Sequence, residues 1–374
     1  MPSVFLTLVF CFCQRETAVG QMIFENFWFS TYNSPMTSSL LPAPQLSWPV
    51  NWHDIFGREA ALLLEIGFGG GHFLVDLAQK RPSANVLGVE ISLPALDRAQ
   101  RKIKTGVLGN VRLLQSDARY LLQALCAPES LAEVYINFPD PWPKARQLHR
   151  RLINVDFLHL LATRLVPGGL LDIATDHADY ALAITEALEA TPYFRSRLAT
   201  TFVTEDNERL RTKYEQIGLA EGRICHYYKW ERRKTAVPNQ YPVPKEFPMP
   251  HVVLHSPLNL DEIQAQYGRW QFSVDNCHIN FMELFRAKAE DALFVETYIK
   301  EEPVTQRLGL VIRQREPGNY VISLHELGFP RPTLGVQRAI GQLATWLLGL
   351  HEEATLLHHN LQPEVLEREV NHAA

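Results

Sequence analysis

Between residues 61 and 189 the chain alternates short, continuous apolar runs with longer segments in which apolar residues recur every three or four positions. The short runs are typical of strands buried on both faces of a sheet, and the longer segments are typical of amphipathic helices. The sequence predicts strands at residues 61–66, 85–91, 111–115, 131–137 and 170–175, and helices at 71–80, 93–105, 152–165 and 178–189. Strands and helices that alternate in this way form a parallel sheet covered by helices on both faces. The predicted fold class is therefore α/β, with a doubly wound, mostly parallel sheet.

A different pattern begins after residue 236. Residues 237–250 carry five prolines, which favours an extended linker. Beyond them the apolar positions predict strands at 252–255, 270–274, 293–299, 308–314 and 320–324, and helices at 260–267 and 335–351. We expect four parts: a disordered extension at 1–35, a first domain at 36–236, a linker at 237–250, and an α+β domain at 251–374.

Composition and charge narrow the class of protein. The chain is 46% hydrophobic and 21% charged, which is typical of a soluble globular protein. Its net charge of −5 is unevenly distributed, since residues 235–374 hold 11 basic and 17 acidic side chains, and the first 234 residues hold 25 and 24. If the protein binds a nucleic acid, we therefore expect the first part of the chain to hold it.

Cysteines, histidines and the N-terminus exclude several other classes. The five cysteines are odd in number, and their spacing fits neither a metal site nor a disulfide framework, which favours reduced thiols in a cytoplasm. We expect no metal, and we expect His358 and His359 at a solvated helix end. Residues 3–13 are apolar, but they are about half the length of a membrane-spanning helix. They also lack the basic start and the cleavage site of a secretory signal.

Glycines follow the first predicted strand, where parallel sheets bind ligands. The strand ends in Glu65-Ile66-Gly67-Phe68-Gly69-Gly70-Gly71, and glycines let a backbone approach a ligand closely. The dinucleotide fingerprint is broken, because its last glycine falls on His72 when counted from Gly67 and on Leu74 when counted from Gly69. Glu65 would repel a pyrophosphate and suits a cationic ligand. A plain tight turn is the alternative interpretation.

Acids follow the next predicted strands. Glu90 ends the second strand, where a carboxylate can accept hydrogen bonds from both hydroxyls of a ribose. Asp117 follows the third strand and could accept a hydrogen bond from an adenine amino group. Each of them alone is also typical of a structural helix cap. Asp176 follows the fifth strand, either as a cap of the next helix or as a further acid facing the same cleft.

The fourth predicted strand runs into the segment Asn137-Phe138-Pro139-Asp140-Pro141-Trp142-Pro143-Lys144. Three prolines stiffen it, so Asp140 is held at the end of the strand, unless the segment is only a rigid turn. A basic run follows with no acid to offset it: Lys144, Arg146, His149, Arg150 and Arg151. Basic side chains are unfavourable at a helix N-terminus without an anion nearby, which favours contact with phosphates over a solvated helix start. The segment therefore indicates chemistry on a polyanion.

Together these motifs resemble the bacterial tRNA (guanine-N7-)-methyltransferases over residues 62–233. The resemblance is carried by Leu-Glu-Ile-Gly-Phe-Gly-Gly-Gly at 64–71, Gly-Val-Glu-Ile at 88–91, Asn-Phe-Pro-Asp-Pro-Trp-Pro-Lys at 137–144, Ala-Thr-Asp at 174–176 and Thr-Lys-Tyr-Glu at 212–215. It implies a Rossmann-like class I fold, S-adenosylmethionine as methyl donor and tRNA as partner, with no DNA and no membrane. It also implies methyl transfer to N7 of a tRNA guanine, usually position 46 in the variable loop.

The resemblance also implies a role for individual residues. Contacts to S-adenosylmethionine are implied for Glu65, Gly67, Gly69, Glu90, Asp117 and Asp140. Substrate contacts are implied for Lys144, Asp176, Thr212, Lys213, Tyr214 and Glu215, and RNA contacts for Arg146, His149, Arg150 and Arg151. Without the resemblance, residues 212–215 would be interpreted as surface, and Trp142 is either a platform for a stacked base or a packing residue of its loop.

Asp140 is the predicted catalytic residue, and its role follows from the chemistry of guanine. N7 is a bare acceptor that carries no proton, so methyl transfer to it requires no general base. It requires negative potential near a ring that becomes cationic, which a fixed carboxylate supplies.

The chain also departs from the family pattern. The only basic residues among residues 1–64 are Arg15 and Arg58, whereas the family has a basic arm there. Gln147 and Leu148 also interrupt the basic run that follows Asp140. The C-terminal domain is extra. Three alternative functions remain: methylation of an exocyclic amino group, non-catalytic RNA binding, and nicotinamide-dependent oxidation, which the broken glycine fingerprint disfavours. The oligomeric state stays open.

Overall fold

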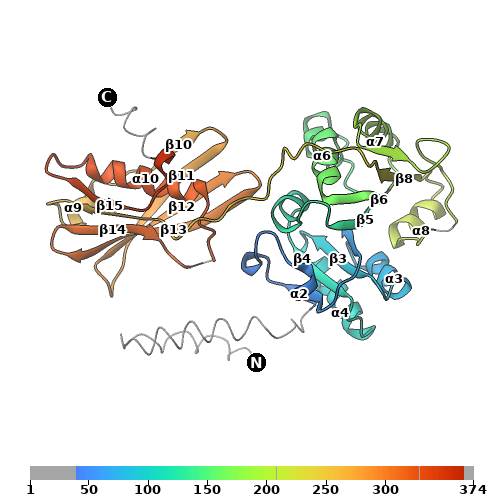
Figure 1. The fold of residues 1–374 in the computed structure, drawn as a ribbon, viewed down its shortest axis with the longest axis horizontal. Coiled ribbons are helices and arrows are strands. Elements are labelled where there is room, and N and C mark those ends of the chain that lie inside the picture. The colour runs from blue at the N-terminus through green and yellow to red at the C-terminus, as the bar shows by residue number, and fades with distance from the viewer. Residues whose placement is uncertain (1–38, 208, 328, 366–374) are drawn as a thin grey trace.

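Two β-sheets, each with an apolar core of its own, make up the described part of the chain. The computed structural model describes residues 39–207, 209–327 and 329–365. Figure 1 shows the two sheets as separate bodies joined by an extended segment. The predicted extension at residues 1–35 lies outside the described residues. Among the residues described, no helix has both the length and the apolar character needed to cross a membrane.

The first sheet has the predicted doubly wound topology. Its strand order is β1-β4-β3-β2-β5-β6-β8-β7, and all neighbours are parallel except those of β8. The strands are β1 (Leu40–Leu41), β2 (Leu62–Ile66), β3 (Asn85–Glu90), β4 (Val111–Gln115), β5 (Leu131–Asn137), β6 (Leu165–Thr175), β7 (Phe194–Ser196) and β8 (His226–Arg232). The strand order reverses between β2 and β5, which is the point at which such sheets bind ligands.

Helices cover both faces of this sheet, as the continuous apolar strands predict. They are α2 (Trp52–Phe56), α3 (His72–Lys80), α4 (Leu93–Thr105), α5 (Ala118–Tyr120), α6 (Val155–Arg164), α7 (Ala178–Ala190) and α8 (Lys213–Ala220). Short 3₁₀ helices span Ala43–Gln45 (η1) and Ala145–Arg150 (η3), and a π-helix spans Leu121–Leu125 (η2). The first sheet therefore has an apolar cluster on each face. Leu63 of β2 packs with Phe73 and Leu96 in one cluster, and the next residue, Leu64, packs with Phe157 in the other.

The boundary between α6 and β6 differs from the prediction. The helix begins at Val155, because the side chain of Asn154 accepts a hydrogen bond from the Phe157 N–H and caps it. It ends at Arg164, near the predicted stop. However, β6 begins at Leu165 and includes Pro167, Gly168 and Gly169. A register shift against β5 accommodates them, so the prolyl-glycine segment belongs to a strand and not to a loop.

The second sheet is antiparallel, with strand order β10-β11-β12-β13-β14-β9-β15. Its strands are β9 (His251–His255), β10 (Trp270–Val274), β11 (Cys277–Arg286), β12 (Ala292–Glu301), β13 (Val304–Glu316), β14 (Asn319–Leu324) and β15 (Thr355–His359). The helices α9 (Leu260–Ala265) and α10 (Leu334–Leu348) pack on it. The predicted strands did not include β11. The helix end expected at His358 and His359 was wrong, since both residues lie in β15.

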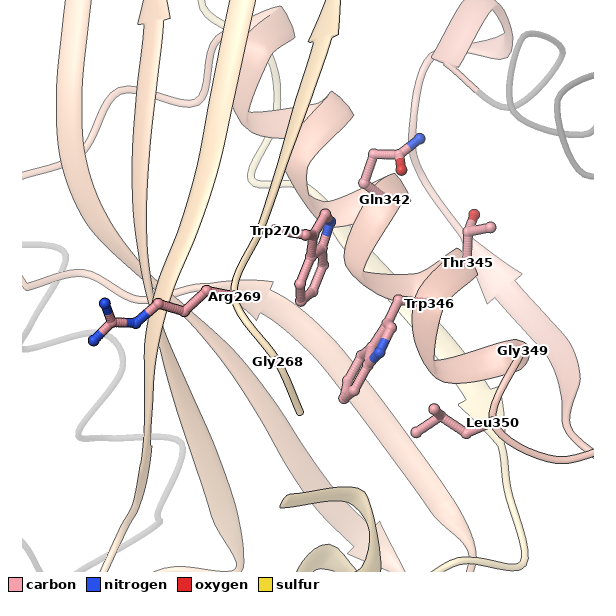
Figure 2. A pocket seen from close by; sticks show the side chains of 8 residues that line it. All are labelled: Gly268, Arg269, Trp270, Gln342, Thr345, Trp346, Gly349 and Leu350. Carbon is pink, nitrogen blue, oxygen red and sulfur yellow. The ribbon is translucent and has the colours of Figure 1, made fainter. Parts of the chain in front are cut away.

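An open pocket of about 540 Å³ lies where the end of α10 meets the start of β10. Figure 2 shows the indole rings of Trp270 and Trp346 on facing elements of this pocket. Their ring centroids are 5.6 Å apart, and Trp270 also stacks on Phe281 at 4.2 Å. The pocket therefore belongs to the aromatic packing between α10 and the second sheet, away from the strand ends of the first sheet.

The first half of the proline-rich segment packs against the first sheet. Val237 and Tyr241 contact its core. The carbonyl of Tyr241 accepts a hydrogen bond from the guanidinium of Arg164, a residue with no exposed surface, and the carbonyl of Pro242 accepts one from Gln123. The domain boundary near residue 236 stays a prediction, and these contacts favour a boundary several residues later.

We expect a chain that ends at residue 236 to be less stable than one that ends at residue 250. The shorter chain lacks the Tyr241 carbonyl, so the buried guanidinium of Arg164 loses an acceptor, at a cost of about 2 kcal/mol. For a unit of this size the midpoint of thermal unfolding should fall by about 5 °C. Calorimetry of the two chains measures the difference, and equal midpoints would refute it.

Candidate functional site

The carboxyl ends of β2, β3, β4, β5 and β6 meet at one edge of the first sheet. Two hydrogen bonds tie neighbouring strand ends together. The Gly69 N–H donates to Glu90 Oε2 at 3.0 Å, which joins the turns after β2 and β3, and Asn137 Nδ2 donates to Glu65 Oε1 at 3.0 Å, which joins β5 to β2. The topology therefore brings the predicted glycine turn, Glu90 and the start of the Asp140 loop to one place.

The glycine turn leaves a stretch of backbone open. Gly67, Gly69 and Gly71 have φ of 71°, 53° and 73°, which side chains rarely adopt. A Cβ atom on Gly71 would lie 2.6 Å from that of Ala99, so this glycine is needed for α4 to pack. A Cβ atom on Gly67 or Gly69 would meet nothing within 4 Å. These two glycines are therefore not required by packing, and they leave room for a ligand against the backbone.

Glu90 has a fixed carboxylate at the end of β3. Its Oε2 accepts from Gly69, and its Oε1 accepts from the N–H groups of Ile91 at 2.9 Å and Ser92 at 3.0 Å. A carboxylate has about four acceptor positions, so one remains after these three bonds. The charge is held in place by backbone donors before any ligand arrives.

Asp117 caps a helix, and Asp176 does not. Asp117 caps α5, because its Oδ1 accepts from the Tyr120 N–H at 2.8 Å, and its side chain is exposed. The alternative that Asp176 caps the next helix was wrong, since His177 caps α7. Asp176 instead forms an ion pair with Arg223. Its predicted contact with substrate stays a prediction.

Glu65 lies beneath the turn with 1% of its surface exposed. Burial raises the pKa of this carboxyl to about 8, against the smaller, opposite effects of the Asn137 hydrogen bond and the Arg209 charge. Its Oε2 is buried and has no hydrogen-bond partner among the described residues. A buried acceptor without a partner is costly, so this oxygen is suited to a cationic or donor group of a ligand.

Arg209 holds the base of the site, and sequence patterns did not predict it. Its guanidinium donates to Asp172 on β6 and to Oδ1 of Asn137 at the end of β5. The rings of Phe73 and Tyr227 flank it, with centroids 5.7 and 5.6 Å away. Because arginine only donates, it fixes the oxygen of the Asn137 amide toward itself. The nitrogen of that amide is then left to donate to Glu65.

Residues 212–215 are partly internal, so the interpretation from the pattern alone that they are surface was wrong for two of them. Thr212 caps α8 and forms a reciprocal capping box with Glu215. Glu215 has no exposed surface and accepts a hydrogen bond from the Tyr227 hydroxyl at 2.9 Å. Tyr214 is 70% exposed. The side chain of Lys213 lies outside the part of the chain that is described. The Thr-x-x-Glu spacing is a known capping signature that could have located this helix.

The Asp140 loop is strained on both sides of an exposed carboxylate. Phe138 and Trp142 have φ of 51° and 41°, in the left-handed region that costs other residues than glycine about 1–3 kcal/mol each. The Nε atom of Arg151 donates to the carbonyl of Pro141 at 2.9 Å and supports the loop. Strain that surrounding contacts maintain is typical of functional loops, and here it fixes Asp140.

The basic run divides into exposed and engaged residues. Lys144 precedes η3 and is exposed, as are Arg146, His149 and Arg150. The guanidinium of Arg150 lies 4.8 Å from the centre of the Trp142 ring. Arg151 is half-buried and its guanidinium lies 4.9 Å from the ring of Tyr180, so this residue supports the loop. The predicted RNA contacts stay predictions, with Arg146, His149 and Arg150 the more accessible.

Comparisons with known proteins cover both halves of the chain. Residues 59–226 match a family model described as "Putative methyltransferase". The tRNA (guanine-N(7)-)-methyltransferase of Thermus thermophilus is 34% identical over 305 residues, which cover 81% of this chain and 94% of that one. The enzyme of the same description from Thermotoga maritima is 39% identical over 175 residues, 47% of this chain and 55% of that one. A solved structure, TrmN from Thermus thermophilus, is 21% identical over 48% of each chain with a TM-score of 0.35.

The stability of the ligand-free protein should fall as pH rises from about 5 to about 9. The pKa of Glu65 is higher in the folded chain than in the unfolded chain, so the folded state binds one more proton between these pKa values. The stabilisation from this proton is complete below the unfolded pKa and is lost as pH rises through about 8. Glu65→Gln should remove much of this dependence, whereas the exposed Glu186→Gln should keep it. Unfolding midpoints at a series of pH values test this, and parallel curves for all three proteins would contradict it.

Loss of Arg209 should destabilise the fold strongly. Arg209→Met leaves Asp172 buried without its partner, and we expect the free energy of unfolding to fall by about 3–5 kcal/mol in a urea titration. Adding Asp172→Leu should restore part of the loss, because no unpaired charge then remains. The matched control is Arg195→Met, whose side chain is 65% exposed. A loss in Arg209→Met no larger than in this control would refute the prediction.

Proposed function

Because this chain belongs to the tRNA (guanine-N(7)-)-methyltransferase family, we propose that methyl transfer takes place at the strand ends of its first sheet, with Asp140 as the catalytic residue. The chain is an enzyme that transfers a methyl group from S-adenosylmethionine to N7 of a guanine in tRNA. We propose position 46 of the variable loop as the target, and the cytoplasm as the place of action.

The residues at the strand ends fit S-adenosylmethionine. The donor has a cationic sulfonium and an ammonium group but no phosphate, and it supplies an electrophilic methyl group. Glu65 offers a buried oxygen without a partner, close beneath an open glycine backbone at Gly67 and Gly69. We propose that Glu65 binds the cationic end, whose positive charge favours the ionised form of this buried carboxyl. We also propose that the remaining acceptor position of Glu90 binds the ribose, and that Asp117 accepts from the adenine amino group.

Asp140 acts as a fixed negative charge in this proposal. Guanine N7 has no proton to remove, so a carboxylate need not take one. Methylation makes the ring cationic, and a charge held in advance stabilises the transition state without reorganising. The same carboxylate can accept from N1–H and the exocyclic amino group, which selects guanine. Asp176, on the next strand end, could share this role.

One observation carries the proposal: Asn137 joins the two parts of the reaction. It is the last residue of β5, its side chain donates to Glu65 beneath the donor site, and its chain continues directly into the strained loop of Asp140. Asn137 thus holds the start of the Asp140 loop at a fixed place relative to Glu65 and the proposed donor site. Alignment of N7, methyl carbon and sulfur is what an in-line displacement requires.

The tRNA must be held with little help from the segment before β2. Arg15 lies outside the described residues. Arg58 donates to Asn85 at 2.8 Å and to the carbonyls of Pro82 and Ala84, so it serves the fold. We therefore propose that Lys144, Arg146, His149 and Arg150 bind the phosphates around the target guanine.

Asp140→Ala should fold normally and lose at least about a hundredfold in kcat, which is typical for removal of one electrostatic contact to a transition state. The side chain is exposed, so the unfolding midpoint should not change. The control is Asp76→Ala on the exposed face of α3. The measurement is transfer of labelled methyl groups to unmodified tRNA, followed by nucleoside analysis.

The product distinguishes the alternatives. 7-Methylguanosine opens its ring in alkali, whereas a base methylated on an exocyclic amino group does not. Activity of Asp140→Ala equal to that of the control would overturn the catalytic assignment. Binding of tRNA without any transfer by the unaltered protein would indicate a scaffold.

A further inference from the structure

Arg331 connects the second sheet to the cofactor edge of the first. It follows β14 in the chain, yet its guanidinium donates to the carbonyl of Leu46 and lies 4.9 Å from the centre of the Trp48 ring. Its side chain is only 14% exposed. The segment that it contacts runs between β1 and α2, before the first strand of the catalytic edge.

Trp48 in turn contacts Tyr120, the last residue of α5. Its indole nitrogen donates to the hydroxyl of Tyr120 at 3.0 Å, and the two rings meet edge to face at 6.0 Å. The N–H of Tyr120 donates in turn to Oδ1 of Asp117 at 2.8 Å. Three contacts in sequence therefore join a side chain of the C-terminal half to Asp117, the acid proposed to accept from the adenine.

The other end of this connection is firmly anchored. The N–H of Arg331 donates to Gln306 Oε1 at 2.6 Å, and Gln306 Nε2 donates to the Arg331 carbonyl at 3.1 Å, which ties the loop to β13. The guanidinium also pairs with Glu246 at 2.7 Å. The next residue accepts a hydrogen bond from the Phe247 N–H at 2.9 Å. Arg331 is thus held by the second sheet and by the segment that joins the two sheets.

The Asp117 end is the part that needs support. Asp117 is exposed and stands at the start of α5, a helix of three residues. Trp48 and Tyr120, in contrast, are half-buried and pack against the core of the first sheet. Packed rings transmit a displacement because protein interiors are nearly incompressible. We therefore expect a change at Arg331 to shift the position of the Asp117 carboxylate.

We propose that Arg331 is a positioning residue for S-adenosylmethionine, through which the second sheet supports the adenine end of the cofactor site. This inference rests on the proposed contact of Asp117 with the adenine. It assigns the C-terminal half a role in cofactor affinity. The residues proposed to bind tRNA all lie elsewhere, on the loop of Asp140.

Arg331→Gln in the full-length protein should weaken cofactor binding selectively. We expect KM for S-adenosylmethionine and Kd for S-adenosylhomocysteine to rise about fivefold, at the lower end of coupling between distinct sites. The values of kcat and of KM for tRNA should not change. Arg331→Lys, which keeps the charge over Trp48 and one donor, should recover most of the affinity. The control is Arg307→Gln on the same sheet, where the side chain is 64% exposed.

A double-mutant cycle separates this role from general stabilisation. If Arg331 acts through Asp117, Arg331→Gln should change the Kd for S-adenosylhomocysteine much less in a chain that already carries Asp117→Ala. A merely structural role predicts the same factor in both backgrounds. Isothermal titration of the four proteins, well below their unfolding midpoints, gives the comparison.

The outcomes are distinct. An unchanged Kd in Arg331→Gln, or equal factors in both backgrounds, would overturn the inference and leave the proposed function intact. An unchanged Kd in Asp117→Ala alone, which removes the acceptor, would show that the proposed adenine contact is wrong, and the inference would fall with it.

Discussion

A positive charge buried beneath the strand ends determines how this site is built. Arg209 donates to one carboxylate and one amide and has two aromatic rings beside it, so it occupies a position that few other side chains could take. Arg209 belongs to the segment between β7 and α8, and it contacts Asn137 at the end of β5. The strand order alone does not predict that this segment lies beside β5. Because Arg209 binds the oxygen of the Asn137 amide, the nitrogen of that amide points toward Glu65 and donates to it. The proposed donor site above and the proposed catalytic loop beside it both depend on this one orientation.

The chemistry of the proposed reaction explains why Glu90 and Asp140 are suited to act as fixed charges and need not exchange protons. No proton has to leave guanine N7, so no group with a pKa near neutrality is needed to carry one. Glu90 is held by three backbone donors, and Asp140 is held by prolines and by left-handed backbone on both sides. Such a site contributes alignment and potential. Both are set during folding, before either substrate binds.

Much of the fold and part of the site could be predicted from the sequence. Continuous apolar runs located the strands of the first sheet, and the acids at their ends were local signals. The sequence pattern did not reveal Arg209, because nothing local distinguishes a buried arginine from an exposed one. Glu215 differs, since it looks like a surface acid only until its local capping partner Thr212 is recognised. In the second sheet β11 was missed because a bulge between Phe281 and Leu284 interrupts its alternation. Only Arg209 is decided by contacts across long separations in the chain, to Asp172 and Asn137.

The contact of Arg331 with Leu46 joins residues 285 positions apart in the chain. A protein is synthesised from its N-terminus, and domains begin to fold as they emerge. All strands of the first sheet leave the ribosome before Arg331 is made. That sheet can therefore assemble while Leu46 and Trp48 still lack their contacts with Arg331. The proposed cofactor site of a nascent chain would then mature in two steps, and the second would come only after Arg331 has left the ribosome. Full affinity for the methyl donor would thus require a second sheet that is synthesised long after the first.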